Sequence, residues 1–377
     1  MADPSSLKLA TRNSQLETVR RRQSGFPRII IKTPNWIGDA VMASPFIGAL
    51  RSHWPQAHIA VMTRPKIRPV ADRIPGVDTV VDETTRSPLR LAKILRTGEY
   101  DIAFTLASSF SIAAAFRLAR IPVRIGFSGG GRGPFLTAAV RPLPRSVHQV
   151  DHYLALARAA GAEPGPVHST AWMVLPDDRR EAVQFLKASG AVEGSSLTAI
   201  APGASYGPAK RWLRARWAEL GDRLCLGSGM RIVLVGGKDE IEAAQSIAAL
   251  MARPPIFAVG ALSLGGTAAL LARSRVFVSN DSGLMHVGAA VGAPTLGLFG
   301  SSNPRWTGPV GARGERSSPY ASFAGVKVGS VWGHVPCSPC YRRACLPGRR
   351  YACQNSLTVD LVLDSLPVPS LRPSYRP

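Results

Sequence analysis

The chain lacks the long hydrophobic run that a membrane-spanning helix requires. Its most apolar eighteen-residue window, residues 102–119, is interrupted by serines and by Arg117. Residues 1–25 contain five lysines and arginines but no apolar segment of the kind found in secretory signal peptides. We therefore expect neither a membrane span nor export, and we expect the protein to stay in the cytoplasm.

Acidic residues are scarce, at 24 against 46 lysines and arginines in 377 residues, so the formal net charge is +22. Such an excess implies an anionic partner, which could be nucleic acid, anionic lipid or a phosphorylated substrate. Cysteines are few as well, and four of the five lie close together near the C-terminus. This usage fits a reducing compartment better than a disulfide scaffold.

Several short motifs of nucleotide and metal enzymes are also missing. There is no G-x-x-x-x-G-K-[ST] loop, and the first strand–helix turn lacks the G-x-G-x-x-G of dinucleotide sites. Neither H-E-x-x-H nor D-x-D occurs, so nothing indicates a metal bound to a nucleotide pyrophosphate. We see no recognition helix, RNP motif or basic run interleaved with aromatics, which argues against a nucleic-acid partner.

What the sequence does contain is two series of short apolar runs that alternate with helical segments. This alternation predicts an α/β fold with a doubly wound parallel sheet in each half, because the chain is longer than one core usually serves. The predicted strands are residues 28–32, 57–62, 77–81, 101–106, 124–127, 197–201, 231–235, 276–278 and 295–299. The predicted helices are residues 40–51, 89–96, 148–160, 179–188, 212–225, 240–251, 284–291 and 357–366.

The segment 163–176 carries three prolines and a glycine and is the predicted linker region. The predicted organisation is a flexible basic arm (1–26), an N-terminal domain (27–175), a C-terminal domain (176–354), a C-terminal helix (355–366) and a disordered tail (367–377). The tail is assigned from its four prolines.

Residues 276–300 read as a strand–loop–helix–strand unit, VFVSNDSGLMHVGAAVGAPTLGLFG. Residues 279–282 are all favoured at helix N-caps, and Gly283 allows another molecule to approach the backbone. A helix N-terminus presents unpaired N–H groups and a positive dipole end, which suit a phosphate. His286 lies one turn beyond Ser282 on the same face. An ordinary capped packing helix would give the same short pattern.

Ligands of open α/β sheets bind beyond the carboxyl ends of the strands. The loops expected to line such a site are residues 33–39, 202–211, 236–240 and 279–283. In the first of these, Asp39 follows Gly38 beside a helix start, where a carboxylate should stay ionised. It could accept a proton from a hydroxyl group, although an N-cap would look the same.

The loop 202–212 is broken by glycine and proline and ends in Lys210, Arg211 and Trp212. A lysine there can neutralise charge on a leaving phosphate, whereas a merely solvated cation at a helix start would be unfavourable. The segment 236–240, GGKDE, also follows a strand. Its carboxylates could hold ribose hydroxyls, or the segment could be a surface turn.

Cys337, Cys340, Cys345 and Cys353 form the pattern C-x2-C-x4-C-x7-C. The first pair has metal-ligand spacing, but the later spacings match no strong zinc pattern. A structural zinc or iron–sulfur site and a set of free thiols both remain open.

Three motifs occur in a characteristic order: residues 33–39 (TPNWIGD), residues 202–212 (PGA followed by KRW) and residues 280–286 (NDSGLMH). Together they resemble the bacterial heptosyltransferases of glycosyltransferase family 9. The resemblance covers nearly the whole chain, from about Arg28 to Leu366. Residues 124–127 (RIGF) and the four clustered cysteines resemble one subgroup of that family, whereas the arm before Phe26 and the tail depart from its pattern.

The resemblance implies a GT-B fold, in which two Rossmann-like domains face a cleft. The N-terminal half would bind a lipopolysaccharide acceptor and the C-terminal half ADP-heptose, with inversion at the anomeric carbon and no catalytic metal or other cofactor. Asp39 would be the catalytic base, and Lys210 would act with it by holding the pyrophosphate. The residues assigned to the donor are Lys210, Glu240, Asp281, Ser282, Gly283 and His286. Glu242 is an alternative to Glu240.

The implied reaction moves heptose from ADP-L-glycero-D-manno-heptose to heptosyl-Kdo-lipid A of the lipopolysaccharide inner core. The acceptor is anionic, so a protein of charge +22 would be drawn to the inner face of the inner membrane as a peripheral enzyme. We also expect the enzyme to be a monomer. Two other interpretations stay open. One keeps the GT-B fold but makes the protein a nucleotide-sugar epimerase. The other is a non-enzymatic basic nucleic-acid-binding protein.

Overall fold

The computed structural model describes residues 26–165, 169–191, 195–228, 230–311 and 327–368. The chain divides into two compact domains, residues 1–168 and 169–377. This division falls inside the segment 163–176 that the sequence predicts as the linker region. The predicted arm lies outside the described residues except for its last residue, as does the tail beyond residue 368.

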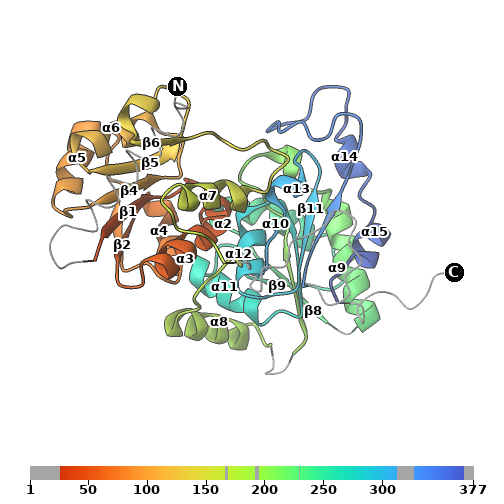
Figure 1. Cartoon of the computed structure of the whole chain (residues 1–377). Coiled ribbons are helices and arrows are strands. Elements are labelled where there is room, and N and C mark those ends of the chain that lie inside the picture. Colours follow the sequence, from red (N-terminus) through yellow and green to blue (C-terminus); the bar gives the residue numbers. More distant parts are fainter. Residues whose placement is uncertain (1–25, 166–168, 192–194, 229, 312–326, 369–377) are drawn as a thin grey trace. The chain divides into compact units, whose positions relative to one another are not determined.

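The first domain is built on a parallel sheet whose six described strands follow the order β3-β2-β1-β4-β5-β6 (Figure 1). The strands are β1 (Arg28–Lys32), β2 (His58–Thr63), β3 (Thr79–Asp82), β4 (Ile102–Thr105), β5 (Val123–Phe127) and β6 (Ala138–Val140). The helices are α2 (Ile37–Met42), α3 (Ser44–His53), α4 (Arg68–Ala71), α5 (Pro88–Arg96), α6 (Phe110–Leu118) and α7 (Gln149–Arg158), with 3₁₀ turns at Pro65–Ile67 and Gly133–Phe135.

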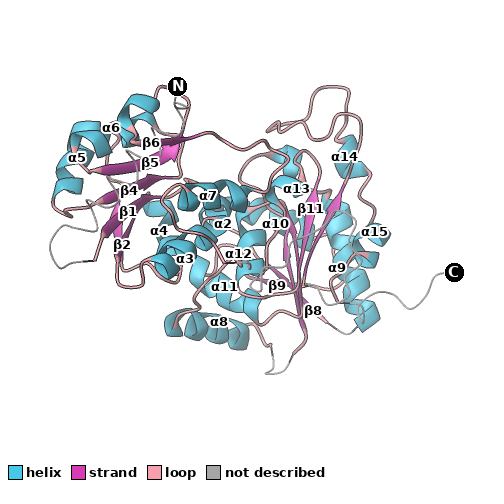
Figure 2. Ribbon diagram, in the orientation of Figure 1, coloured by secondary structure: helices cyan, strands magenta, loops and turns pink. Residues whose placement is uncertain are grey.

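Helices cover both faces of this sheet, with α5 and α6 on one side and α2, α3, α4 and α7 on the other (Figure 2). Ile30 of β1 is fully buried against Leu91 of α5 and Phe116 of α6. Because both faces are covered, β1 reads as a continuous apolar run, which is why the sequence pattern identified it.

The predicted helix 40–51 is wrong in one respect, because two helices, α2 and α3, meet at Ala43. Pro45 sits in the first turn of α3, where its missing N–H costs nothing, whereas inside a single helix it would break a hydrogen bond. The Ser44 hydroxyl donates to the Val41 carbonyl at 2.7 Å, which ties the two helices together. The consequence is a short first helix, α2, that carries Asp39.

The second domain has a parallel sheet whose six described strands follow the order β12-β11-β10-β7-β8-β9. The strands are β7 (Leu197–Ala201), β8 (Arg231–Leu234), β9 (Ile256–Phe257), β10 (Val276–Asn280), β11 (Thr295–Phe299) and β12 (Val328–Trp332). The helices are α8 (Pro176–Ala188), α9 (Arg214–Ser228), α10 (Ile241–Ala248), α11 (Leu264–Ala272), α12 (Gly283–Ala290), α13 (Pro304–Thr307), α14 (Ala352–Asn355) and α15 (Val359–Asp364), with 3₁₀ turns at Pro208–Lys210 and Lys238–Glu240.

Helices α8, α11 and α12 lie on one side of this sheet, and α9 and α15 lie on the other (Figure 2). The predicted C-terminal helix, residues 357–366, is shorter in the structure. It begins at Val359, where the Thr358 hydroxyl accepts a hydrogen bond from the Leu361 N–H, and it ends at Asp364. Leu357 and Leu366 flank it and are fully buried in the core with Trp217 of α9.

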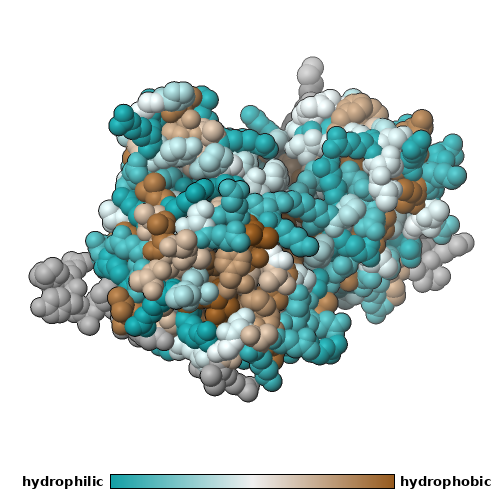
Figure 3. Space-filling view, turned by 180° about the vertical axis from the view of Figure 1, so that it is seen from behind, coloured by the Kyte–Doolittle hydropathy of each residue, from teal (hydrophilic) through white to brown (hydrophobic). Residues whose placement is uncertain are grey.

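No helix in the described ranges is both long and apolar enough to cross a membrane. Hydrophilic residues occupy much of the face shown in the space-filling view, with hydrophobic residues gathered in separate patches (Figure 3).

Candidate functional site

The carboxyl ends of β10, β7 and β8 are neighbours at one edge of the second sheet. The loops after these strands carry Asp281, Lys210 and Glu240 respectively. Residues that are far apart in the sequence are therefore brought to the edge where ligands of such sheets bind. The topology therefore places three of the four predicted loops, residues 202–211, 236–240 and 279–283, at one end of the second sheet.

Lys210 and Asp281 form the polar centre of this edge. The Lys210 ammonium and the Ser302 hydroxyl both donate to Oδ2 of the Asp281 carboxylate. The Asp281 side chain is 5% exposed and that of Lys210 is 18% exposed. The carboxylate thus fixes a cation whose side chain is still partly open to solvent.

The prediction that residues 279–282 form a loop of capping residues is wrong for Ser279 and Asn280, which belong to strand β10. Asn280 ends strand β10, fully buried, and its amide joins two segments of the loop before α9. Nδ2 donates to the Pro202 carbonyl at 2.6 Å, and Oδ1 accepts from the Trp212 N–H at 3.1 Å. Ser279 likewise belongs to the strand. These bonds hold the Lys210 loop against β10.

The N-cap of α12 is Ser282, whose side chain makes no capping hydrogen bond to the helix. Its hydroxyl instead lies 3.1 Å from that of Ser279. Ser282 and Gly283 are partly exposed, whereas His286, one turn further along α12, is buried with 3% exposure. The N–H groups of the first turn are therefore left for another acceptor, which is the arrangement that binds phosphate.

The structure distinguishes Glu240 from its alternative, Glu242. The Glu240 Oε2 accepts a hydrogen bond from the Gly237 N–H at 3.0 Å. A Cβ added to Gly203 would lie only 1.9 Å from Glu240 Oε1, so the carboxylate reaches the end of β7 as well as β8. Glu242 is exposed on α10. Geometry favours Glu240 as the carboxylate of this site.

Asp39 lies in the first turn of α2, half-buried, at the carboxyl end of β1 in the first domain. The N-cap of α2 is Trp36, so the alternative that Asp39 is an N-cap is wrong. Tyr153 of α7 lies near it: burial raises the pKa of the Tyr153 phenol well above its usual value, and the Asp39 charge raises it further. Asp39 therefore faces a neutral phenol rather than a second anion.

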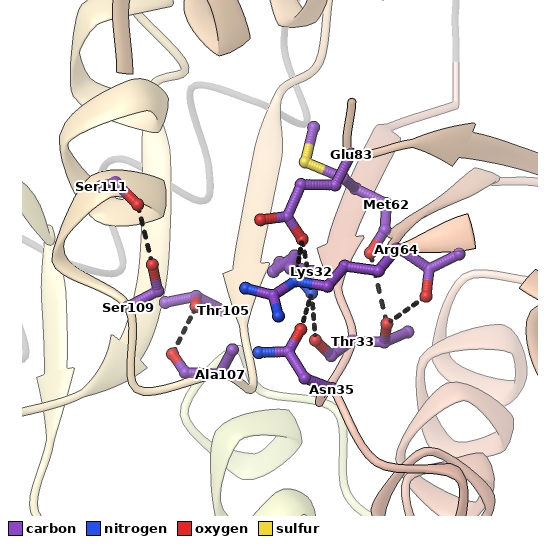
Figure 4. Close-up of polar contacts among 11 residues, drawn as sticks. Lys32, Thr33, Asn35, Met62, Arg64, Glu83, Thr105, Ala107, Ser109 and Ser111 are labelled. Atoms are coloured by element: carbon purple, nitrogen blue, oxygen red, sulfur yellow. Dashed lines mark hydrogen bonds and ion pairs between the residues drawn. The ribbon is translucent and has the colours of Figure 1, made fainter. Parts of the chain in front are cut away.

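Sequence reasoning missed a buried charge network at the same edge of the first domain. Lys32, the last residue of β1, is 1% exposed, and its Nζ donates to the Thr33 carbonyl at 2.6 Å and to Asn35 Oδ1 at 3.0 Å. Glu83 Oε2 lies 3.3 Å from Lys32 Nζ and 3.6 Å from Arg64 Nε (Figure 4). Burial lowers the pKa of Lys32, and the Glu83 charge opposes that shift.

This network ties the loop before α2 to the end of β3. Removing one partner of a buried ion pair leaves the other charge uncompensated. Glu83→Gln should therefore lower the free energy of unfolding by roughly 3–5 kcal/mol, measured by urea denaturation. The neighbouring exposed pair of Asp82 with Arg68 provides the control, because Asp82→Asn should leave the unfolding midpoint close to that of the wild type. Equal effects of the two substitutions would show that burial of the pair does not matter.

All five cysteines are free thiols, and Cys353 and Cys225 are buried while Cys340 is exposed. Burial, together with the other three clustered cysteines, raises the pKa of the Cys353 thiol to about 11, so it stays protonated near neutral pH. Within the described ranges, no group of three or more histidine, cysteine, aspartate or glutamate side chains is arranged to hold a metal ion.

Comparison with known proteins agrees with these observations. Lipopolysaccharide heptosyltransferase 2 of Salmonella typhimurium is 33% identical over 306 residues, which cover 75% of this chain and 85% of that protein. The structure of Escherichia coli ADP-heptose lps heptosyltransferase II matches with a TM-score of 0.72 and 27% identity, covering 91% of this chain and 98% of that one. A family 9 glycosyl transferase from Veillonella parvula has the same fold, with a TM-score of 0.75 and 23% identity over 91% of this chain and 97% of its own.

The chain has two Rossmann-like domains, and polar side chains gather at the carboxyl ends of the strands in the second. This architecture is that of a glycosyltransferase of the GT-B class. The family model described as "Glycosyltransferase family 9 (heptosyltransferase)" matches residues 88–346 of this chain. The chain belongs to glycosyltransferase family 9, the heptosyltransferases. The resemblance seen in the three motifs is confirmed, and the Salmonella and Escherichia coli relatives that match most of the chain are named heptosyltransferase 2 and heptosyltransferase II.

Proposed function

We propose that this glycosyltransferase moves heptose from ADP-L-glycero-D-manno-heptose to heptosyl-Kdo-lipid A, with inversion at the anomeric carbon. The observation that carries the proposal is the Lys210–Asp281 pair beside the uncapped N-terminus of α12. Both features suit the diphosphate of a nucleotide sugar. The names of the relatives support heptose as the sugar and lipopolysaccharide as the acceptor class.

Charge at the leaving group decides how such a reaction is accelerated. The glycosyl transition state resembles an oxocarbenium ion, while negative charge grows on the departing ADP. Lys210 and the first-turn N–H groups of α12 are positioned groups that stabilise this charge as it develops. Glu240, at the ends of β7 and β8, is placed to accept hydrogen bonds from ribose hydroxyls.

The acceptor hydroxyl must lose its proton as it attacks the anomeric carbon. We assign this step to the Asp39 carboxylate, which the α2 helix presents at the carboxyl edge of the first sheet. The acceptor is an anionic lipid-linked saccharide, and the net charge of +22 suits peripheral attachment to the inner face of the inner membrane. That attachment should weaken as salt is raised.

The proposal includes catalysis without a metal ion at the diphosphate. A brief treatment with EDTA should therefore leave turnover unchanged, because Lys210 and the α12 N-terminus supply the charge stabilisation. Abolition of turnover by EDTA, with recovery on adding Mg²⁺ or Mn²⁺, would contradict this. A slow loss accompanied by unfolding would instead indicate a structural metal at Cys337 and its neighbours.

A transferase is separated from an epimerase of the same fold by its products. With ADP-heptose alone, the transferase should release little ADP, and release should rise strongly when heptosyl-Kdo-lipid A is added. Conversion of ADP-heptose into a stereoisomer without any acceptor would support the epimerase. A salt-dependent mobility shift of RNA, with no binding of ADP-heptose, would support the nucleic-acid-binding alternative.

A further inference from the structure

The segment that follows β12 packs its backbone against the loop that carries Lys210. The Ala209 N–H donates to the Arg343 carbonyl at 3.0 Å, and the Tyr206 hydroxyl donates to the Tyr341 carbonyl at 2.8 Å. The Gln354 amide donates to the Ala209 carbonyl at 2.9 Å and is itself buried. These three bonds fix the position of Arg343 relative to the donor-site loop.

Gly207 permits this close packing. A Cβ at position 207 would lie 2.4 Å from the Arg343 carbonyl oxygen, and the residue has a φ of +154°. Both the contact and the backbone conformation are suited to glycine alone. The approach of the two segments is therefore built into the loop rather than being a loose surface contact.

The Tyr206 ring makes cation–π contacts with two side chains. Lys210 Nζ lies 5.1 Å from its centroid, and Arg343 Cζ lies 5.5 Å from it. Each distance is within the range of a cation–π interaction. The exposed Arg343 guanidinium and the Lys210 ammonium therefore share one aromatic partner, Tyr206.

Lys210 alone is a weak counter-ion for a diphosphate, because the Asp281 carboxylate already neutralises much of its charge. Arg343 has no acidic partner in the described salt bridges. A guanidinium presents several N–H donors in a planar fork that matches phosphate oxygens. Lys210, which is paired with Asp281, and Arg343, which is not paired with an acid in the described salt bridges, would together match the two phosphates of a nucleoside diphosphate.

We propose that Arg343 is a second diphosphate-binding residue, positioned by the Tyr206 ring that also contacts Lys210 and by its backbone bond to Ala209. The inference rests on the proposed function, since it takes the ligand to be the ADP moiety of the donor. It assigns Arg343 to the terminal phosphate, the one bonded to the sugar. Arg343 would then stabilise the leaving group together with Lys210.

The test compares Arg343→Gln with Arg342→Gln, which removes the same charge from the adjacent exposed residue. Arg343→Gln should weaken calorimetric ADP affinity about tenfold, the size expected for one charge-assisted hydrogen bond, while Arg342→Gln should match the wild type. AMP lacks the terminal phosphate, so its affinity should change little. Arg343→Lys should restore part of the ADP affinity, because it restores the charge without the fork.

The substitution leaves the packing of the segment intact, because the bond from Ala209 ends on the backbone carbonyl of Arg343. Equal ADP affinity of the Arg343→Gln and Arg342→Gln proteins would overturn the inference while leaving the proposed function standing. A wild-type protein that binds no ADP would overturn the proposed function and the inference with it.

Discussion

Replacing Asp39 by asparagine should lower turnover at saturating substrates by roughly 10²–10⁴-fold, the usual contribution of general-base catalysis. An inverting displacement needs one group to take the acceptor's proton as the hydroxyl attacks opposite the leaving ADP. Asp39 is a half-buried carboxylate in the first turn of α2, and the amide that replaces it is nearly isosteric but cannot accept the proton. ADP affinity should be unchanged, since Asp39 has no part in holding the donor.

This role has two alternatives, which are another base and a structural role for Asp39. His286 is the alternative base, but it is buried within α12, the helix whose N-terminus we assign to the leaving diphosphate. Its position therefore places it on the leaving-group side. Turnover of Asp39→Asn within about threefold of the wild type, well short of the expected loss, would refute the assignment where chemistry limits the rate. A large loss accompanied by a lower melting temperature would point to support of α2 instead.

Replacing Lys210 by alanine should have the second largest effect, weakening ADP binding and slowing transfer together. The loss should exceed that of one ordinary hydrogen bond, because the Asp281 carboxylate is left buried and without its ammonium partner beside the bound phosphates. We expect a decrease in calorimetric ADP affinity of roughly 10–100-fold. Lys210→Arg should retain part of the function, since it keeps the charge.

The control for Lys210 is Lys187→Ala, which removes an exposed lysine from the last turn of α8. That protein should bind ADP as the wild type does, which shows that net charge alone is not responsible. A second variant, Lys210→Ala combined with Asp281→Asn, removes the stranded carboxylate and should recover some ADP affinity. Unchanged ADP affinity and normal turnover in Lys210→Ala would exclude the role.

The sequence predicted most strands of both sheets because strands buried on two faces appear as unbroken apolar runs. The same feature hid α6, which lies inside the apolar window 102–119 that also contains β4. Helix α11 was also missed. Its sequence LGGTAALLA contains two glycines and is buried nearly all round, so it shows no amphipathic period.

The position of Lys210, Glu240 and Asp281 at one end of the second sheet could be predicted, because they follow predicted strands and neighbouring parallel strands bring their ends together. What could not be predicted was the partner of each side chain. Asn280 looked like a cap until the structure showed its amide bonded to Pro202 and Trp212. The only hint of the buried Lys32 network was a lysine ending an apolar strand, since Glu83 comes from a distant strand end.

Arg343 illustrates the same limit. It lies in an irregular, basic segment where the sequence offers no period and no motif beyond the cysteines. Only the packing of that segment against Gly207 and Tyr206 brings it to the aromatic ring that Lys210 also contacts. A cation of this kind can be found in the sequence only as one of many, because the chain has 46 lysines and arginines.

Mass spectrometry of the acceptor lipid tests the central claim most directly. The protein is incubated with ADP-heptose and heptosyl-Kdo-lipid A, with Asp39→Asn as the matched inactive control. The account predicts that the lipid gains one heptose unit, that ADP is released in equal amount, and that the control lipid stays essentially unmodified. A lipid of unchanged mass in the presence of folded wild-type protein that binds ADP-heptose would contradict it.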